Sequence, residues 1–446
     1  MSCIDAASTL HCAKLAHARV PPSRDKAQYH VMRSSWLPIL LGVLTAVGPI
    51  STDMYLPAFP AIEASFGGAP GTAQITLATW FLGLAIGQVT QGSLSDRFGR
   101  RGPLIVGTVL YTLASVGCAL APSLWSLSLF RALAALGGSA SMVIPRAVVR
   151  DISEGLGAAR LLSRLMLVMG AAPILAPTLG GLILGFTSWH AIFWISALYG
   201  AICCAMVVLW LPDTLPKSMR VSLDPARMLR RYATIAVERS FITHAATGGF
   251  ALSAMFAYLA GSPFVFINIF HLPPWLYGTL FGACAAGYIT ASQLNPFFIV
   301  RYGPSRVMRV SIRIAALASL VLLGCALARV AHWWAFAAPI GVMMSAMGFV
   351  LPNATVGCLQ KHAAHAGSAS ALMGTLQFCL GALTGVAVGA LDDGTARPMA
   401  ALMVLGTFCA VAIDRLRPRV QSFPSAAPQA APGETPANPT PVRRAA

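Results

Sequence analysis

The sequence predicts an all-α membrane protein of twelve transmembrane helices, grouped as two six-helix bundles around a central cavity. Three observations predict this fold. First, 57% of the 446 residues are apolar and only 10% are charged, whereas a soluble chain carries about 25% charged residues. Second, apolar runs of about 20 residues, the length that crosses a bilayer, recur along the chain. Third, Lys and Arg gather in alternate connections between these runs, as in a multi-pass protein of fixed orientation.

The apolar runs are separated by short polar connections and by one longer polar stretch near the middle of the chain. That stretch, residues 212–240, is rich in charged side chains, so we expect a solvated loop joining two halves of six helices. The expected spans are 36–57, 72–93, 103–121, 123–146, 159–184, 189–211, 241–267, 274–299, 306–328, 333–357, 367–390 and 396–414.

The expected domain organisation follows from these boundaries. Residues 1–35 are polar and lack the apolar core of a signal peptide, and the tail is rich in Pro and Ala. We therefore expect both ends to be disordered in the cytosol. The expected segments are a disordered N-terminal segment 1–35, an N-terminal bundle 36–211, a cytosolic central loop 212–240, a C-terminal bundle 241–415 and a disordered tail 416–446. Met32, just before the first span, is an alternative start.

Loop charges indicate the orientation of the helices. With the N-terminus inside, the outside loops hold almost no positive residue except Arg329 and Arg397. Positive loops stay cytoplasmic, so we expect a bacterial inner-membrane protein with both termini in the cytoplasm. The inside loops carry Arg97, Arg100, Arg101, Arg150, Arg160, Arg301, Arg306 and Lys361.

The net charge of +17 also raises the possibility of a nucleic-acid partner. The basic residues are scattered between apolar runs, however, and do not form one face of a solvated domain. We therefore expect the partners to be the lipid bilayer, a small solute and protons, with no nucleic acid.

Two similar halves are visible in the sequence. The connection after the second span contains Gly99, and the connection after the eighth contains Gly303, 204 residues later. The first spans of the two halves begin 205 residues apart by the boundaries above. Parallel repeats of this kind occur in transporters that rock around a central site.

One connection carries a specific motif, Gly-Ser-Leu-Ser-Asp-Arg-Phe-Gly-Arg-Arg at 92–101. It resembles motif A of the major facilitator superfamily. We expect Gly99 to make a tight turn, Gly92 to let helices approach closely, and Asp96 to pair with an arginine, with Arg146 and Arg150 as candidate partners. Contacts of this kind would hold the cytoplasmic side closed. The gating set is Gly92, Asp96, Arg97, Gly99, Arg100 and Arg101.

Further matches narrow the resemblance over residues 36–415. They are Asp53-Met-Tyr-Leu-Pro57 with Pro60, Arg131, the segment 146–151, Ala172-Pro173, the segment 176–181, Ser188-Trp-His190, Phe193-Trp194 and Gly261-Ser-Pro-Phe-Val265. Together they resemble the Bcr/CflA (bicyclomycin/chloramphenicol-resistance) group of drug:proton antiporters. The resemblance implies a major facilitator fold that works by alternating access.

The fifth span ends in a pattern similar to antiporter motif C, with Ala176 at the usual Gly. Pro173 and Pro177 each remove a backbone donor and favour a bend. Gly180 and Gly181 allow close helix packing. We expect these four residues to form a hinge, and the alternative is ordinary membrane-helix packing.

Two charged residues inside the spans are the candidates for proton coupling. A carboxylate in a span costs about 2.5–3.5 kcal/mol by insertion scales, and burial favours its protonated form. Asp53 is therefore expected to take a proton from outside and release it inside, as the resemblance implies for first-span acids. Arg131, which resembles the arginine of motif B, is expected to pair with Asp53 or to tune it through water. The alternatives are an Asp53 that only caps at the outer interface and an Arg131 that snorkels to the surface.

Aromatic and amide side chains in the spans are candidates for contact with solute, because aromatic rings bind bulky apolar or cationic molecules. Simple packing is the stronger alternative for each of them. The candidates are Tyr55, Trp80, Phe81, Tyr258, Phe264, Tyr288, Gln293 and Gln377.

The expected function is proton-coupled efflux of hydrophobic or amphiphilic drugs by a monomer without a cofactor. The chain has no Walker loop, nucleophile elbow or metal-ligand spacing, so we expect neither ATP-driven export nor enzyme activity. The alternatives are an exporter dedicated to a metabolite or small peptide, and a membrane sensor or scaffold that transports nothing.

Overall fold

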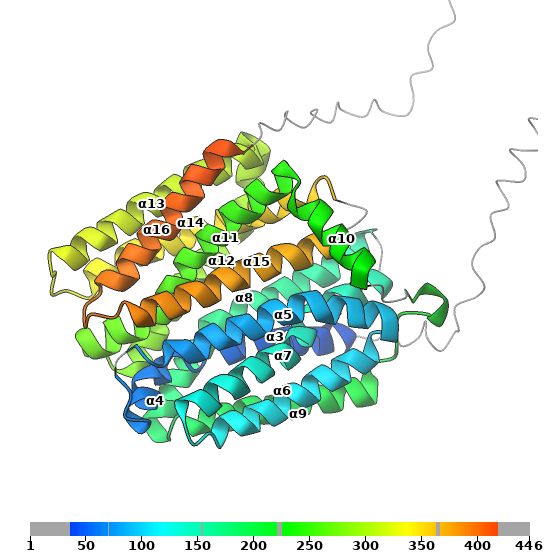
Figure 1. Ribbon diagram of the computed structural model, residues 1–446, viewed down its shortest axis with the longest axis horizontal. Helices are drawn as coiled ribbons and strands as arrows, with labels where there is room; N and C mark the ends of the chain where they lie inside the picture. The colour runs from blue at the N-terminus through cyan, green and yellow to red at the C-terminus, as the bar shows by residue number, and fades with distance from the viewer. Residues whose placement is uncertain (1–35, 70, 153–154, 221–224, 363–365, 418–446) are drawn as a thin grey trace, which may run out of the picture.

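The computed structural model describes residues 36–69, 71–152, 155–220, 225–362 and 366–417, and this part of the chain contains twelve long helices (Figure 1). The first six are α3 (Leu37–Asp53), α5 (Gln74–Phe98), α6 (Arg101–Ala119), α7 (Leu124–Ile152), α8 (Gly155–Phe186) and α9 (His190–Trp210). The second six are α11 (Arg239–Pro263), α12 (Pro274–Tyr302), α13 (Pro304–Leu327), α14 (Trp334–Leu359), α15 (Ala366–Ala390) and α16 (Arg397–Leu416). The all-α architecture expected from the sequence is confirmed. The expected segment 1–35 lies outside the described residues, and so does the expected tail 416–446 except for its first two residues, of which Leu416 ends α16.

Among the described residues, nine helical segments are long and apolar enough to cross a membrane, and a shorter apolar helix covers Gly170–Phe186. The helices α5 and α12 fall below that threshold. Several of their polar residues are buried in protein: α5 buries Gln74, Gln91 and Ser95, and α12 buries Asn295. Large apolar side chains are exposed around the outside of the bundles, Phe186 and Val300 among them. A soluble monomer rarely displays so much apolar surface.

Two helices change their regular geometry at or near prolines. The first span ends as a regular helix at Asp53 and continues as a 3₁₀ turn η1 (Leu56–Ala58) and the short helix α4 (Phe59–Ser65). Pro57 and Pro60 lack the N–H groups that would continue the hydrogen-bond ladder. In the second half, α11 passes at Pro263 into the π-helical turn η3 (Phe264–Ile269).

The helices pack as two bundles joined along two seams. Within the first bundle α7 packs on α5 and α6, and within the second α14 packs on α12 and α13. The seams between the bundles pair α5 with α15 and α8 with α12. One hydrophobic core runs through both bundles, and a smaller cluster surrounds Ile235.

The central stretch 212–240 is more ordered than the loop expected from its charge. It contains the 3₁₀ turn η2 (Lys217–Met219) and the helix α10 (Pro225–Ala236), which packs on α11 and α15 (Figure 1). The reason is amphipathicity: Arg230 is exposed, whereas Ile235, five residues on and on the opposite side of the helix, is buried.

Candidate functional site

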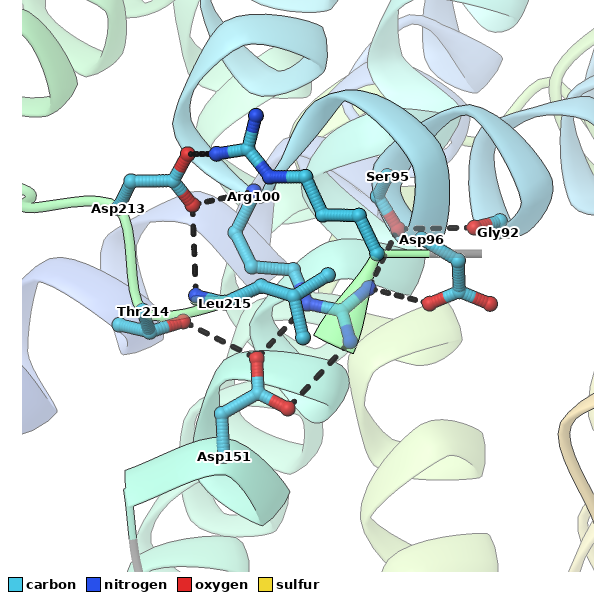
Figure 2. Close-up of polar contacts among 9 residues, drawn as sticks. Gly92, Ser95, Asp96, Arg100, Asp151, Asp213, Thr214 and Leu215 are labelled. Carbon is cyan, nitrogen blue, oxygen red and sulfur yellow. Dashed lines mark hydrogen bonds and ion pairs between the residues drawn. The ribbon is translucent and has the colours of Figure 1, made fainter. Parts of the chain in front are cut away.

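Arg100 joins two helices at the turn between α5 and α6. Its Nη1 donates to Asp96 Oδ1 at 2.6 Å, and its Nε donates to Asp151 Oδ2 at 2.8 Å. Asp96 is on α5 and Asp151 is on α7, and Figure 2 shows the guanidinium between their carboxylates. Burial alone would lower the pKa of Arg100, but the hydrogen bonds and charges of Asp151 and Asp96 outweigh it and raise that pKa. The side chain is therefore a permanent cation that ties α5 and α6 to α7.

Asp213, three residues after α9, completes this network. Its Oδ1 accepts the backbone N–H of Arg100 at 2.9 Å, and its Oδ2 accepts a hydrogen bond from Arg220 at 2.6 Å. Gly99 lies beneath it with φ +89° and ψ 173°, a conformation essentially restricted to glycine. A Cβ at Gly99 would also overlap the Asp213 carboxylate. The tight turn expected at Gly99 is thus present, and the Asp213 carboxylate, beyond the end of α9, gives a second reason for glycine.

Other residues of the motif behave differently from what the sequence suggested. A Cβ added at Gly92 would meet nothing within 4 Å, so Gly92 is not a point of close helix approach. It lines a cavity instead. The partner found for Asp96 is Arg100, from its own motif, and Arg146 lines the same cavity. The side chain of Arg150 is outside the described part. Arg101 donates to the Val208 carbonyl, and Arg97 lies over the Phe98 ring.

Arg131 of α7 lies in an aromatic cage and is only 2% exposed. Its guanidinium carbon is 4.0 Å from the ring centroid of Tyr55 and 4.3 Å from that of Trp80. Its Nη1 donates to the Ser51 carbonyl at 2.9 Å, while Nε and Nη2 have no hydrogen-bond partner among the described residues. The alternative of an arginine that snorkels to the surface is wrong, because the charge is held under the rings.

Asp53 is buried at the end of α3, where the two bundles meet. Within the described ranges, its carboxylate makes no hydrogen bond or ion pair, so the direct pair with Arg131 is not formed. Arg131 instead holds the backbone two residues before Asp53. From the second bundle, Tyr258 and Tyr277 lie within electrostatic reach of Asp53. Asp53 is therefore a buried acid facing the junction of the two bundles.

The glycines of the motif C segment bring α8 into backbone contact with its neighbours beside Asp53. A Cβ at Gly180 would overlap the carbonyl of Met54, and a Cβ at Gly181 would overlap that of Pro274 in α12. The relation is reciprocal, because Gly278 of α12 lies against the Pro177 carbonyl. Pro173 and Pro177 lie inside α8, which continues to Phe186. The two bundles thus meet backbone to backbone at this end.

Three phenylalanines from three helices meet across the other seam. The ring centroids of Phe81 (α5) and Phe256 (α11) are 4.1 Å apart, and Phe378 (α15) lies 6.1 Å from Phe81. Of the three, the sequence singled out only Phe81. Phe256 and Phe378 lie in apolar runs with many similar residues, and only the packing distinguishes them.

The remaining candidates for solute contact are dispersed. Tyr258 stacks on Phe281, and Gln377 lies near Gly248. Phe264 begins the π-helical turn, Tyr288 is half-buried and Gln293 is exposed.

A cavity of about 560 Å³ opens between the bundles at the end that carries the Arg100 network. Residues of α5, α7, α10 and α15 line it, including Gln88, Ser93, Arg146, Tyr232 and Ser370. Its volume suits a small molecule. The candidates chosen from the sequence for solute contact do not line this cavity. Aromatic character selected residues that pack the seams, whereas the walls of the cavity combine charged and hydroxyl side chains with apolar ones.

A search of the described residues finds no group of three or more His, Cys, Asp or Glu side chains placed to hold a metal ion. The described arrangement combines a buried acid, a caged arginine, a cavity between the bundles and an ion-pair network.

Comparison with known proteins agrees with this architecture. The model of the Major Facilitator Superfamily matches residues 41–386. The uncharacterized MFS-type transporter YdgK of Bacillus subtilis strain 168 is 34% identical over 373 residues, which are 82% of this chain and 91% of the relative. The bicyclomycin resistance protein homolog of Haemophilus influenzae is 28% identical over 382 residues, which are 85% of this chain and 95% of that relative. The multidrug resistance protein MdtL of Escherichia coli is 28% identical over 265 residues, which are 59% of this chain and 67% of that relative.

Solved structures share the fold at low identity. The nucleoside transporter NupG superposes with a TM-score of 0.66 at 13% identity, covering 85% of this chain and 98% of that one. The Escherichia coli xylose transporter XylE superposes with a TM-score of 0.65 at 11% identity, covering 87% of this chain and 100% of that one. With the family match over most of the chain and the named resistance relatives, these comparisons show that the chain is a multi-pass membrane transporter that belongs to the major facilitator superfamily, in its Bcr/CflA group.

Proposed function

We propose that the protein is a proton-coupled antiporter that expels hydrophobic or amphiphilic small molecules from the bacterial cytoplasm by alternating access. The observation that carries the proposal is Asp53, a buried carboxyl group at the junction of the bundles with no partner among the described side chains. Burying an ionised carboxylate without a partner between the bundles costs free energy. The charge state of Asp53 is therefore coupled to how the bundles pack. The names of the Haemophilus and Escherichia relatives support efflux of toxic compounds.

The geometry supports a cytoplasm-facing state. The positive loops assign the Arg100 end to the cytoplasm, and the cavity opens at that end. At the opposite end α8 and α12 meet through Gly180, Gly181 and Gly278. A solute enters the cavity from the cytoplasm, the bundles rock about the α8–α12 contact, and the solute leaves outside. Coupling requires that proton and solute favour different states, since a ligand with equal affinity for both shifts nothing.

Each part of the site has a role in this scheme. Asp53 takes a proton when the outer end is open and loses it towards the cytoplasm. Arg131 holds the last turn of α3 against α7 and sets the electrostatic potential near Asp53. The Arg100 network forms the brace on the cytoplasmic side. The transporter works as a monomer in the inner membrane, uses the proton gradient and needs no cofactor.

The test is dye efflux in everted membrane vesicles. Asp53→Asn should insert normally, yet lose efflux driven by a proton gradient, and an uncoupler should abolish wild-type efflux. The matched control is Asp393→Asn, which alters an exposed acid in the α15–α16 connection and should transport normally. Efflux that survives the uncoupler would refute proton coupling, and normal efflux by Asp53→Asn would remove Asp53 from its role.

The same experiment separates the alternatives. A dedicated exporter of a metabolite or small peptide would leave dyes in place but protect cells from one compound in a growth screen. A sensor or scaffold would move no solute in either assay.

A further inference from the structure

The helix α10 of the central stretch has one side anchored in the second bundle. Ile235 is 2% exposed and belongs to a separate hydrophobic cluster. The other members of that cluster come from α11, α14 and α15: Phe241, Ala245, Cys358, Ala369 and Met373. All of them belong to the second bundle. An apolar anchor of this kind makes α10 move with α15 and not with α5.

The residues just before Ile235 reach the first bundle. Arg231 and Tyr232 line the cavity together with Ser93 and Asp96 of α5. The Tyr232 hydroxyl lies within hydrogen-bonding reach of the Ser93 side chain, and the Ser93 hydroxyl also donates to the Val89 carbonyl. Burial raises the pKa of the Tyr232 phenol, the Ser93 hydrogen bond and the charge of Arg231 act to lower it, and the carboxylate of Asp96 adds to the rise. Tyr232 is thus a half-buried group seated against the gating motif.

These two contacts place α10 across the seam between α5 and α15. On this basis we propose that α10 is a moving wall of the transport cavity: it travels with the second bundle, and the Tyr232–Ser93 contact latches it to the first. The proposal rests on the proposed alternating-access function. It assigns a role to a stretch that its charge alone marked as a plain connector.

The physical argument is geometric. Rocking of the bundles changes the separation of α5 and α15 at this end, because the cavity lies between them. A helix fixed to α15 through Ile235 cannot keep Tyr232 on Ser93 when that separation changes. The contact must therefore break and reform in each cycle. The solute that fills the cavity lies against Arg231 and Tyr232 as well as the serines of α5 and α15.

The first test uses the hydroxyl groups of the latch. Tyr232→Phe keeps the ring and removes the hydrogen bond, and Ser93→Ala removes its partner. Both should shift the transport rate in the same direction, and the effect of the double variant should be smaller than the sum of the two single effects, since the Tyr232–Ser93 interaction is lost in all three. Additive effects would overturn the latch. The control is Thr234→Ala, an exposed position on the same helix whose hydroxyl donates to the Arg230 carbonyl.

The second test locks the contact. Ser93→Cys combined with Tyr232→Cys should form a disulfide on oxidation, stop transport, and recover when reduced. Each single cysteine variant, with the native cysteines present, should be insensitive to the same treatment. Unchanged transport by a protein that mass spectrometry shows to be cross-linked would overturn the proposal. Failure of the wild type to transport would instead count against the proposed function.

A third measurement does not depend on transport. Spin labels at Thr234 and at Val310 of α13 should give one distance distribution in lipid nanodiscs, because both sites belong to the second bundle. Labels at Thr234 and at Leu94 of α5 should give two distances, one for each state of the cavity. The reverse pattern, two distances for Thr234 with Val310 and one for Thr234 with Leu94, would show that α10 is not carried by the second bundle.

Discussion

Arg131 on α7 donates a hydrogen bond of 2.9 Å to the backbone carbonyl of Ser51 on α3, and so fixes the turn that ends at Asp53. The cation binds main chain and aromatic rings, not the nearby acid. The acid and the arginine therefore act on one another through the end of α3 and not through a salt bridge. Substitutions at Arg131 should change how Asp53 is positioned.

Arg131→Lys tests whether the planar guanidinium matters beyond its charge. Lysine keeps the cation but loses the flat contact with Tyr55 and Trp80 and the oriented Nη1 donor. A desolvated cation–π contact is worth about 2 kcal/mol, so the thermal unfolding midpoint in detergent should fall and proton-driven efflux should weaken. A lysine variant that matches wild type in both assays would show that charge alone suffices.

Gly99→Ala and Gly303→Ala form a matched pair at the two repeated turns. Both glycines have positive φ, 89° and 77°, so each alanine should cost about 1–3 kcal/mol of backbone strain. Only at Gly99 does the new Cβ also overlap the Asp213 carboxylate, since nothing lies within 4 Å at Gly303. Gly99→Ala should therefore lower the unfolding midpoint more than Gly303→Ala. Equal decreases of the two unfolding midpoints would mean that the Asp213 side chain moves aside without a cost in stability.

Gly180→Ala should disturb the end of the bundles where α8 meets α3. Its Cβ would overlap the Met54 carbonyl, next to Asp53. We expect normal expression but reduced efflux, with greater reactivity of cysteine probes at this end. Gly185→Ala is the control, because it lies on the same helix with open space around it. There alanine should be neutral or slightly stabilising, by up to about 1 kcal/mol.

Glu238 gives the protein a pH-dependent contribution to stability outside the spans. Burial would raise its pKa, but the N–H of Phe241, 2.7 Å from Oε2, and the ammonium of Lys361 outweigh it and lower the pKa below 4.5. A group with a lowered folded-state pKa stabilises the fold above its unfolded pKa and loses that contribution as pH falls through the folded value. Thermal midpoints of the wild type should therefore drop below about pH 4.5.

Glu238→Gln is the matching variant. It keeps an oxygen that can cap α11 but removes the charge, so it should be less stable than wild type near neutral pH. The difference between the two proteins should shrink in acid. A difference that stays constant with pH would assign the effect to shape and not to charge.

Predictions from the sequence were most accurate for features that depend only on residues close together in the chain. The ends of α6, α9 and α15 fall within two residues of the expected spans, because the length of an apolar run sets where a helix can cross a bilayer. Gly99 was predicted to make a turn for an equally local reason, a backbone conformation that other residues resist, and Gly303 in the matching connection also has a positive φ.

The sequence did not indicate which side chains meet. Asp151 and Asp213 are 51 and 113 residues from Arg100, yet both bind it, and neither was assigned to the gating motif. Phe256 and Phe378 were indistinguishable from other apolar residues until the seam between α5, α11 and α15 placed them beside Phe81.

By itself, the sequence determined that this protein is a helical membrane protein with two related halves and a specific turn motif, because hydropathy, loop charge and glycine spacing are properties of neighbouring residues. Only the tertiary structure decided that Arg131 holds the end of α3 and not the Asp53 carboxylate, that the polar cavity lies beside the motif, and that α10 spans the seam. These depend on long-range packing, in which each buried polar group takes the partner that geometry brings within reach.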